Sequence, residues 1–168
     1  MTNKIPFLRD DLLLEDSWET LSVSDIDALL PDHFNGREDF VRFWLAANGG
    51  YFTKGCVFYR DHFYDVSKDG YTDVEIESFY FIPRHTGDDS PVLLSVRDVW
   101  ERRKGYSPAM KKFCETHLPF AGDGGDHDYW LDLKTGIIKL MVPEESEDAI
   151  LIAPSFMDFC SHLQSSRR

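Results

Sequence analysis

The stretch from residue 37 to residue 50 constrains the fold more than any other part of the sequence. Four large apolar residues recur in it at the spacing of one helix face: Phe40, Val41, Trp44 and Leu45. The segment then ends in Asn48-Gly49-Gly50, and glycine can take a positive φ where a helix stops and the chain reverses. We therefore expect a deeply packed helix that is followed at once by a strand.

After these glycines the sequence changes to β character, with aromatic and β-branched clusters between polar turns. A short strand is expected over 55–59 and a longer one over 74–82. The longer segment alternates apolar and acidic residues in its first half: Val74 and Ile76 with Glu75 and Glu77. This alternation predicts that the two glutamates lie on an exposed face.

Further helices and a hairpin are expected in the second half of the chain. The pattern over 92–104 is typical of a helix, and a loop from residue 118 leads into a hairpin that reverses at Gly136. Ser155 can cap a last helix, in which Phe156 faces inward.

Composition limits the class of protein. The chain has 168 residues, which suits one domain, and its aromatic share of 14% is too high for a disordered acidic segment. Thirty acidic residues against 18 basic ones give a net charge of −12. Such a charge repels phosphate groups, so we expect neither a nucleic acid nor an anionic membrane as partner, and a basic protein surface as the natural complement.

Cysteine usage and the amino-terminal residues point to the cytoplasm. Cys56, Cys114 and Cys160 are odd in number and far apart, which favours buried thiols over a disulfide framework or a zinc site. The first residues lack a continuous apolar run, and no later run approaches the length of a membrane span. We therefore expect a cytoplasmic protein.

Three short motifs follow one another along the chain. They are Leu30-Pro31 before the helix that ends in Asn48-Gly49-Gly50; the run 118–125, which contains Gly124 and Gly125 and leads to Gly136; and Ser155-Phe156 near the end. In this order, over residues 22–164, they resemble the Smi/Knr branch of the SUKH superfamily. The resemblance implies a single α+β domain, a curved and mostly antiparallel sheet with helices packed against it, and the elements expected above agree. Residues 1–21 would form a lead-in and 165–168 a solvated tail.

The resemblance also implies a function without catalysis. Most bacterial members of the family look like immunity proteins of polymorphic toxin systems, which block a cognate toxin domain, frequently a nuclease, by tight binding. We accordingly expect a basic toxin domain as partner, no cofactor, and a monomer or weak dimer. The sequence departs from the common family pattern at Asp126-His127, where a further glycine is often found, and in a longer region over 84–117.

The most site-like segment is the acidic loop that holds Asp123, Asp126 and Asp128. A hard cation needs about six oxygen ligands, and the loop lacks the closing acidic ligand of an EF-hand, so we expect no metal. A glycine-rich turn into a strand explains the same residues, and as an acidic loop they could instead meet a basic partner.

Two other acidic segments and two aromatic residues complete the expected partner-binding set. The densest acidic run is Glu144, Glu145, Glu147 and Asp148; it is either a solvated loop or an electrostatic guide for a basic partner. Glu75 and Glu77 add a second acidic row, and Tyr129 or Trp130, beside the acidic loop, is a candidate exposed anchor.

Two alternative functions stay open from sequence alone. One is a regulatory or scaffold protein like the fungal cell-wall-synthesis members of the same family. The other is a hydrolase that uses Asp123, Asp126 and Asp128. The six histidines show no zinc-binding spacing and no nucleophile elbow or phosphate-binding glycine loop is present, so we expect no enzyme.

Overall fold

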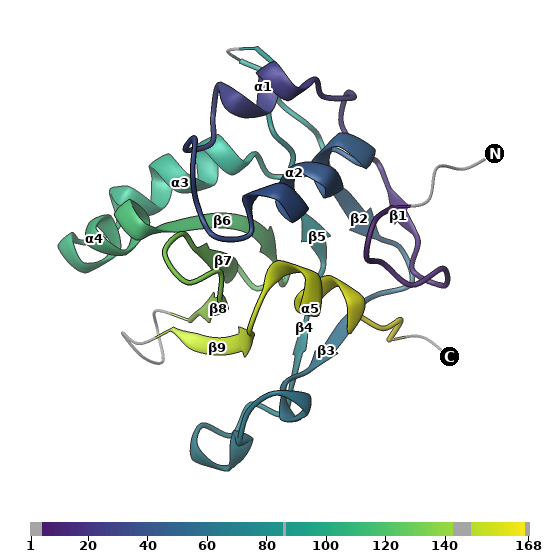
Figure 1. The fold of residues 1–168 in the computed structure, drawn as a ribbon, viewed down its shortest axis with the longest axis vertical. Coiled ribbons are helices and arrows are strands. Elements are labelled where there is room, and N and C mark those ends of the chain that lie inside the picture. Colours follow the sequence, from purple (N-terminus) through teal and green to yellow (C-terminus); the bar gives the residue numbers. More distant parts are fainter. Residues whose placement is uncertain (1–4, 86, 143–148, 167–168) are drawn as a thin grey trace.

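A seven-stranded antiparallel sheet organises the molecule in a computed structural model, which describes residues 5–85, 87–142 and 149–166. The strand order is β1-β2-β5-β6-β7-β8-β9 (Figure 1). Their bounds are β1 (Leu14–Glu15), β2 (Gly50–Phe52), β5 (Ser78–Phe79), β6 (His117–Gly122), β7 (Asp128–Asp132), β8 (Ile138–Met141) and β9 (Ile150–Ala153). Strands β3 (Val57–Tyr59) and β4 (Asp73–Glu75) form a separate antiparallel pair. The expected α+β class is confirmed.

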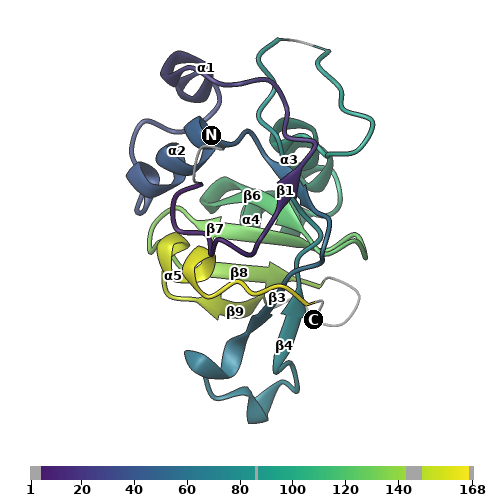
Figure 2. The same ribbon diagram turned by 90° about the vertical axis from the view of Figure 1, so that its right-hand side faces the viewer.

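Helices cover both faces of this sheet (Figure 2). They are α1 (Val23–Asp27), α2 (Arg37–Ala46), α3 (Val96–Lys104), α4 (Pro108–Thr116) and α5 (Phe156–Ser161). As expected, Ser155 caps the last one: its hydroxyl accepts a hydrogen bond from the backbone amide of Asp158 at 3.0 Å. Phe156 is buried, also as expected.

The main core lies between the sheet and the helices α2 and α5. It is an aromatic cluster in which the rings of Phe40 and Trp44 stack 4.0 Å apart, and Phe43 and Phe156 meet edge to face at 5.6 Å. Each of these side chains is fully buried, and a buried aromatic side chain of this size removes 150–250 Å² from water. Aromatic burial of this kind is what holds the expected helix over 37–47 against the sheet.

A second, smaller core lies on the opposite face, under α3 and α4. Trp130 and Met141 from the sheet pack there with Met110 and Cys114 from α4. Neighbouring residues of a strand point to opposite faces, so Trp130 fills this second core while Tyr129 and Leu131 fill the main one. The three cysteines are free and buried, as the sequence predicts.

The Asn48-Gly49-Gly50 turn joins α2 to β2 and packs against residues 79–82. The side chain of Asn48 is buried and makes three hydrogen bonds, donating to the carbonyls of Glu19 and Ile82 and accepting from the amide of Ile82 at 2.7 Å. Gly49 and Gly50 both take positive φ, at 73° and 154°. The expected reversal after the helix is confirmed.

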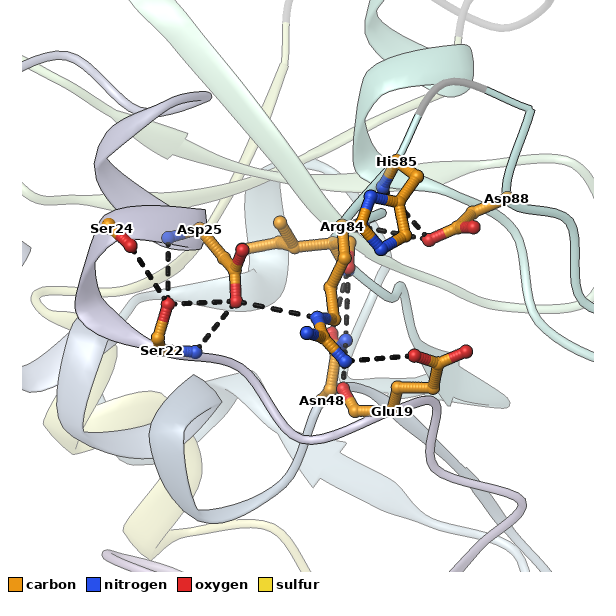
Figure 3. Close-up of polar contacts among 9 residues, drawn as sticks. Glu19, Ser22, Ser24, Asp25, Asn48, Arg84, His85 and Asp88 are labelled. Carbon is orange, nitrogen blue, oxygen red and sulfur yellow. Dashed lines mark hydrogen bonds and ion pairs between the residues drawn. The ribbon is translucent and has the colours of Figure 1, made fainter.

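The lead-in is tied to the rest of the chain through this turn and through a surface ion-pair cluster (Figure 3). Arg84 lies between two acidic groups, 3.0 Å from the carboxylate of Glu19 and 3.6 Å from that of Asp25. Asp25 also closes a capping box with Ser22 at the start of α1. Leu8, Leu12 and Leu21 join the main core, so residues before α1 contribute to its packing.

The expected single strand over 74–82 is wrong, because the chain changes partners within it. Its first part, β4, pairs with β3 to make an arm that projects from the sheet, while β5 lies between β2 and β6 (Figure 1). The amide of Glu77 donates to the carbonyl of Gly122 at 2.8 Å, which marks the change to the main sheet. Arg60 holds the arm, donating from Nε to the carbonyl of Leu151 at 2.7 Å and pairing with Asp69.

Two further expectations need correction. The segment from residue 118, expected as a loop, forms β6 between β5 and β7, with a bulge between Pro119 and Ala121. The bulge accommodates a proline that cannot donate to a regular ladder. The helix expected over 92–104 begins only at Val96, because Ser95 caps it and the backbone at Leu94 and Ser95 pairs with Phe81.

Asp132, at the end of β7, makes the free energy of unfolding depend on pH in the acidic range. Burial raises its pKa, but hydrogen bonds from Lys139, Lys134 and Thr135 outweigh this and lower the pKa from 3.8 to about 2. A lowered carboxyl pKa contributes stability that is present above the unfolded-state value and is lost as the pH falls towards the folded-state value. A shift of this size corresponds to about 2 kcal/mol.

We therefore expect Asp132→Asn to flatten the acid limb of the stability profile. Wild-type protein loses about 2 kcal/mol more than the variant between about pH 5 and about pH 2 in urea unfolding. Asp61 is exposed and provides the control substitution Asp61→Asn. Parallel profiles for wild type and Asp132→Asn would contradict this account.

Candidate functional site

Acidic side chains from two distant segments meet along one side of the molecule. We call this surface the acidic strip; it consists of Asp73, Glu75, Glu77, Asp123 and Asp126. Three adjoining hollows lie along it, with volumes of about 220, 300 and 220 Å³. One side of each hollow is formed by residues of the 73–80 stretch, and another side by the loop between β6 and β7. The structure thus brings together four residues that the sequence predicts for partner binding: Glu75, Glu77, Asp123 and Asp126.

The two segments contact each other closely at Gly124. A methyl group at this position would lie 2.4 Å from Oε2 of Glu77, and Gly124 has a φ of +80°. Only glycine therefore fits without displacing the glutamate. Glu75 and Glu77 are exposed, as the alternating pattern predicts, and the strip is continuous from the arm to the loop.

Hydrogen bonds within the loop between β6 and β7 hold its conformation. Oδ1 of Asp123 accepts hydrogen bonds from the amides of Gly125 at 2.8 Å and His127 at 3.1 Å, and its Oδ2 lies 2.7 Å from Nδ1 of His127. Asp126 has a φ of +66°, which is unusual for a residue with a side chain, and it is exposed. A glycine at this position would take this conformation with less strain.

A buried ion pair fixes the end of the same loop. Arg103 from α3 donates from Nε to Oδ2 of Asp128 at 2.6 Å, and a further guanidinium nitrogen reaches the carbonyl and Oδ1 of Asp126 at 2.9 and 3.0 Å. Tyr80 donates its hydroxyl to Oδ1 of Asp128 at 2.5 Å. Both Asp128 oxygens are thereby satisfied, as a buried carboxylate requires.

Burial is the largest influence on the pKa of each member of this cluster, Asp128, Tyr80 and Arg103. It raises the pKa of Asp128, while the hydrogen bonds from Arg103 and Tyr80 oppose the rise. The pKa of Tyr80 is raised by burial and by the neighbouring Asp128 carboxylate. Burial lowers the pKa of Arg103, but the hydrogen bonds to Asp128 and Asp126 outweigh it and raise the value. Arg103, Tyr80 and Asp128 thus form a buried hydrogen-bonded group that holds the end of the loop in place.

Three expected partner-binding residues are therefore not on the surface. Tyr129 and Trp130 were candidates for an exposed anchor, but both have no exposed surface, because helices cover both faces of β7. Asp128 is 3% exposed and occupied by Arg103 and Tyr80. The expectation of an exposed aromatic anchor at 129 or 130 is wrong. The acidic run of Glu144, Glu145, Glu147 and Asp148 lies outside the described residues.

Sequence reasoning missed the apolar neighbours of the strip. Val92 and Leu94 are 49% and 44% exposed, and they line the hollow that also holds Glu77 and Asp126. Tyr51 borders two of the three hollows. Val92 and Leu94 flank the buried Leu93, and this exposed–buried–exposed pattern is a usable signal, whereas the helical spacing over 92–104 predicts the start of a helix there.

Several kinds of site are not found in the described residues. No group of three or more His, Cys, Asp or Glu side chains there is arranged to hold a metal ion. None of the helices described is both long and apolar enough to cross a bilayer.

The expected motif residues have local structural roles. The carbonyl of Pro31 accepts a hydrogen bond from Arg37 at 2.8 Å, and Gly136, with a φ of +81°, closes the β7–β8 turn.

Comparison with known proteins gives one result. A model of the SMI1/KNR4 family (SUKH-1) matches residues 37–162, which is most of the chain. The chain belongs to the SUKH-1 family. No curated protein and no solved structure matched the chain.

The SUKH-1 match coincides with natural boundaries of the fold. It begins at Arg37, the first residue of α2, and ends at His162, the residue that caps α5. It therefore includes the whole acidic strip and both helices that flank the main core. The lead-in with β1 and α1 lies outside the matched range.

Proposed function

We propose that this SUKH-1 protein is an immunity-type inhibitor that binds a basic toxin domain through the acidic strip and occludes its working surface. Family membership supports a protein that acts through protein partners, as the resemblance to immunity proteins suggests. The net charge of −12 favours a basic partner. The proposal includes a cytoplasmic location, no catalysis and a monomer or weak dimer.

The observation that carries the proposal is a row of carboxylates without cations. Asp73, Glu75 and Glu77 have no ion-pair partner among the described residues, although acidic groups elsewhere, such as Asp69 and Asp128, are paired with arginines. Adjacent like charges repel one another, which costs folding stability. A basic partner would neutralise that repulsion on binding, so the cost becomes binding energy.

The frame beneath the strip suits tight binding. The Asp128–Arg103 pair and the Asp123 hydrogen bonds hold the loop in one conformation before any partner arrives. A surface that is already ordered loses little conformational entropy on association. If the toxin is a nuclease, carboxylates at these positions would occupy the sites that its basic cleft reserves for phosphates.

Co-expression tests the proposal. Cells that express a candidate toxin domain, chosen from a gene that neighbours this one, are expected to survive when the wild-type chain is present and to die without it. Survival should be unchanged when the control variant Glu38→Lys/Glu115→Lys, with two exposed helical residues reversed, replaces wild type. If wild-type protein gives no protection and instead binds endogenous signalling proteins, the regulatory alternative replaces this proposal.

A further inference from the structure

One hollow of the acidic strip is shaped for a single side chain. It measures about 220 Å³, below the roughly 300–1,000 Å³ of typical small-molecule pockets. Its lining includes Tyr51, Val92 and Leu94, which we call its walls, and the carboxylate residues Glu77 and Asp126, which we call its rim. A side chain from a partner protein fits this size better than a cofactor does.

The chemistry of the walls distinguishes among side chains. Val92 and Leu94 offer apolar surface that is about half exposed, and Tyr51 offers an aromatic ring at the border of the hollow. A purely apolar guest would cover these walls but leave the rim carboxylates desolvated and unpaired, which is unfavourable. A guest with an apolar stem and a cationic end satisfies both parts.

Among cations the hollow favours a guanidinium over an ammonium. The Glu77 carboxylate has no partner among the described residues and can accept two parallel hydrogen bonds, a geometry that arginine presents and lysine does not. A planar guanidinium also stacks on an aromatic ring such as Tyr51. Asp126 is already shared with Arg103, so it adds negative field while Glu77 makes the direct contact.

We propose that this hollow, which we call the Glu77 pocket, is the anchor site for an arginine side chain of the partner protein. The inference rests on the proposed function, because it specifies which residue the partner would place on the acidic strip. The stem of that arginine packs on Val92 and Leu94, and its guanidinium pairs with Glu77 beside Tyr51. Anchors of this type, in which one arginine enters a pocket, are typical of binding hot spots.

A peptide titration tests the pocket directly. The probes are three blocked tripeptides, Gly-Arg-Gly, Gly-Lys-Gly and Gly-citrulline-Gly, added to isotope-labelled protein and followed by amide chemical shifts. We expect saturable shifts at Glu77, Leu94 and Gly122 with the arginine peptide, and binding at least about fivefold weaker with lysine or citrulline. Glu77→Gln, an exposed and shape-conserving change, should abolish saturation, whereas Glu115→Gln on α4 should leave it intact.

The possible failures are distinguishable. Equal responses to arginine and lysine peptides, shifts that do not saturate, or shifts unaffected by Glu77→Gln would overturn the arginine pocket. A toxin domain that binds wild type and Glu77→Gln equally would overturn the pocket and leave the proposed function standing. Specific arginine binding without protection from any toxin would support the pocket and remove the proposed function.

Discussion

Replacing Arg103 with methionine is expected to destabilise the protein by about 3–5 kcal/mol, because it leaves a buried carboxylate without its cation. The side chains of Arg103 and Asp128 are 8% and 4% exposed, so water cannot solvate the remaining charge. Methionine keeps most of the apolar stem that packs beneath the loop, which limits the loss to the charge interaction. Urea unfolding at neutral pH measures the change.

Two companion variants separate the charge effect from simple damage. In Arg103→Met/Asp128→Asn the buried charge is removed from both partners and Tyr80 can still donate to the amide oxygen, so we expect recovery of about 2 kcal/mol or more relative to the single variant. Arg102→Met removes a neighbouring arginine that is 54% exposed and 3.9 Å from Asp126, and should cost less than about 1 kcal/mol. If the double variant were no more stable than Arg103→Met, the buried-charge explanation would be wrong.

The second large effect is expected at Gly49. In Gly49→Ala the new methyl group would lie 2.8 Å from the carbonyl oxygen of Tyr80 and 2.9 Å from that of Phe79, and the backbone would keep a φ of +73°. These contacts are with backbone atoms of the strand β5 and its continuation, which cannot rotate away. We expect a loss of about 3 kcal/mol or more, measured by urea unfolding, since a clash adds to the cost of the left-handed conformation.

Gly70 provides a matched control for this change. Its φ of +79° is nearly the same, but a methyl group there would have no neighbour within 4 Å. Gly70→Ala should therefore report only the backbone cost, about 1–2 kcal/mol. Similar losses at Gly49 and Gly70 would show that the close approach of the turn to β5 contributes nothing.

The sequence was most informative where local and long-range structure agree. The helix over 37–47, the Asn48-Gly49-Gly50 turn and the Ser155 cap could each be predicted because their signals are local. The alternation of Val74–Glu77 correctly placed the glutamates on the surface, but it could not show that the chain leaves one sheet for another at Glu77. That change depends on hydrogen bonds to Cys56 and Gly122, which are distant in sequence.

The candidate site was only half predictable for a related reason. Exposed carboxylates are visible in a sequence, and Glu75, Glu77, Asp123 and Asp126 do meet. The burial of Asp128, Tyr129 and Trp130 was not visible, because a strand covered by helices on both faces has no solvent side. In the sequence, Arg103 is one of several basic residues at the end of a helix, and only the fold shows that it forms an ion pair with Asp128.

Charge reversal in the acidic strip tests the central claim most directly. The measurement is the dissociation constant for the purified toxin domain, by calorimetry at two salt concentrations, of wild type, Glu75→Lys/Glu77→Lys and the control Glu38→Lys/Glu115→Lys, which carries the same change in net charge. We expect the strip variant to bind at least about tenfold more weakly than both other proteins, with a reduced salt dependence and a thermal stability no lower than that of the wild type. Equal affinities of the two double variants would show that only net charge matters, and would contradict binding through the strip.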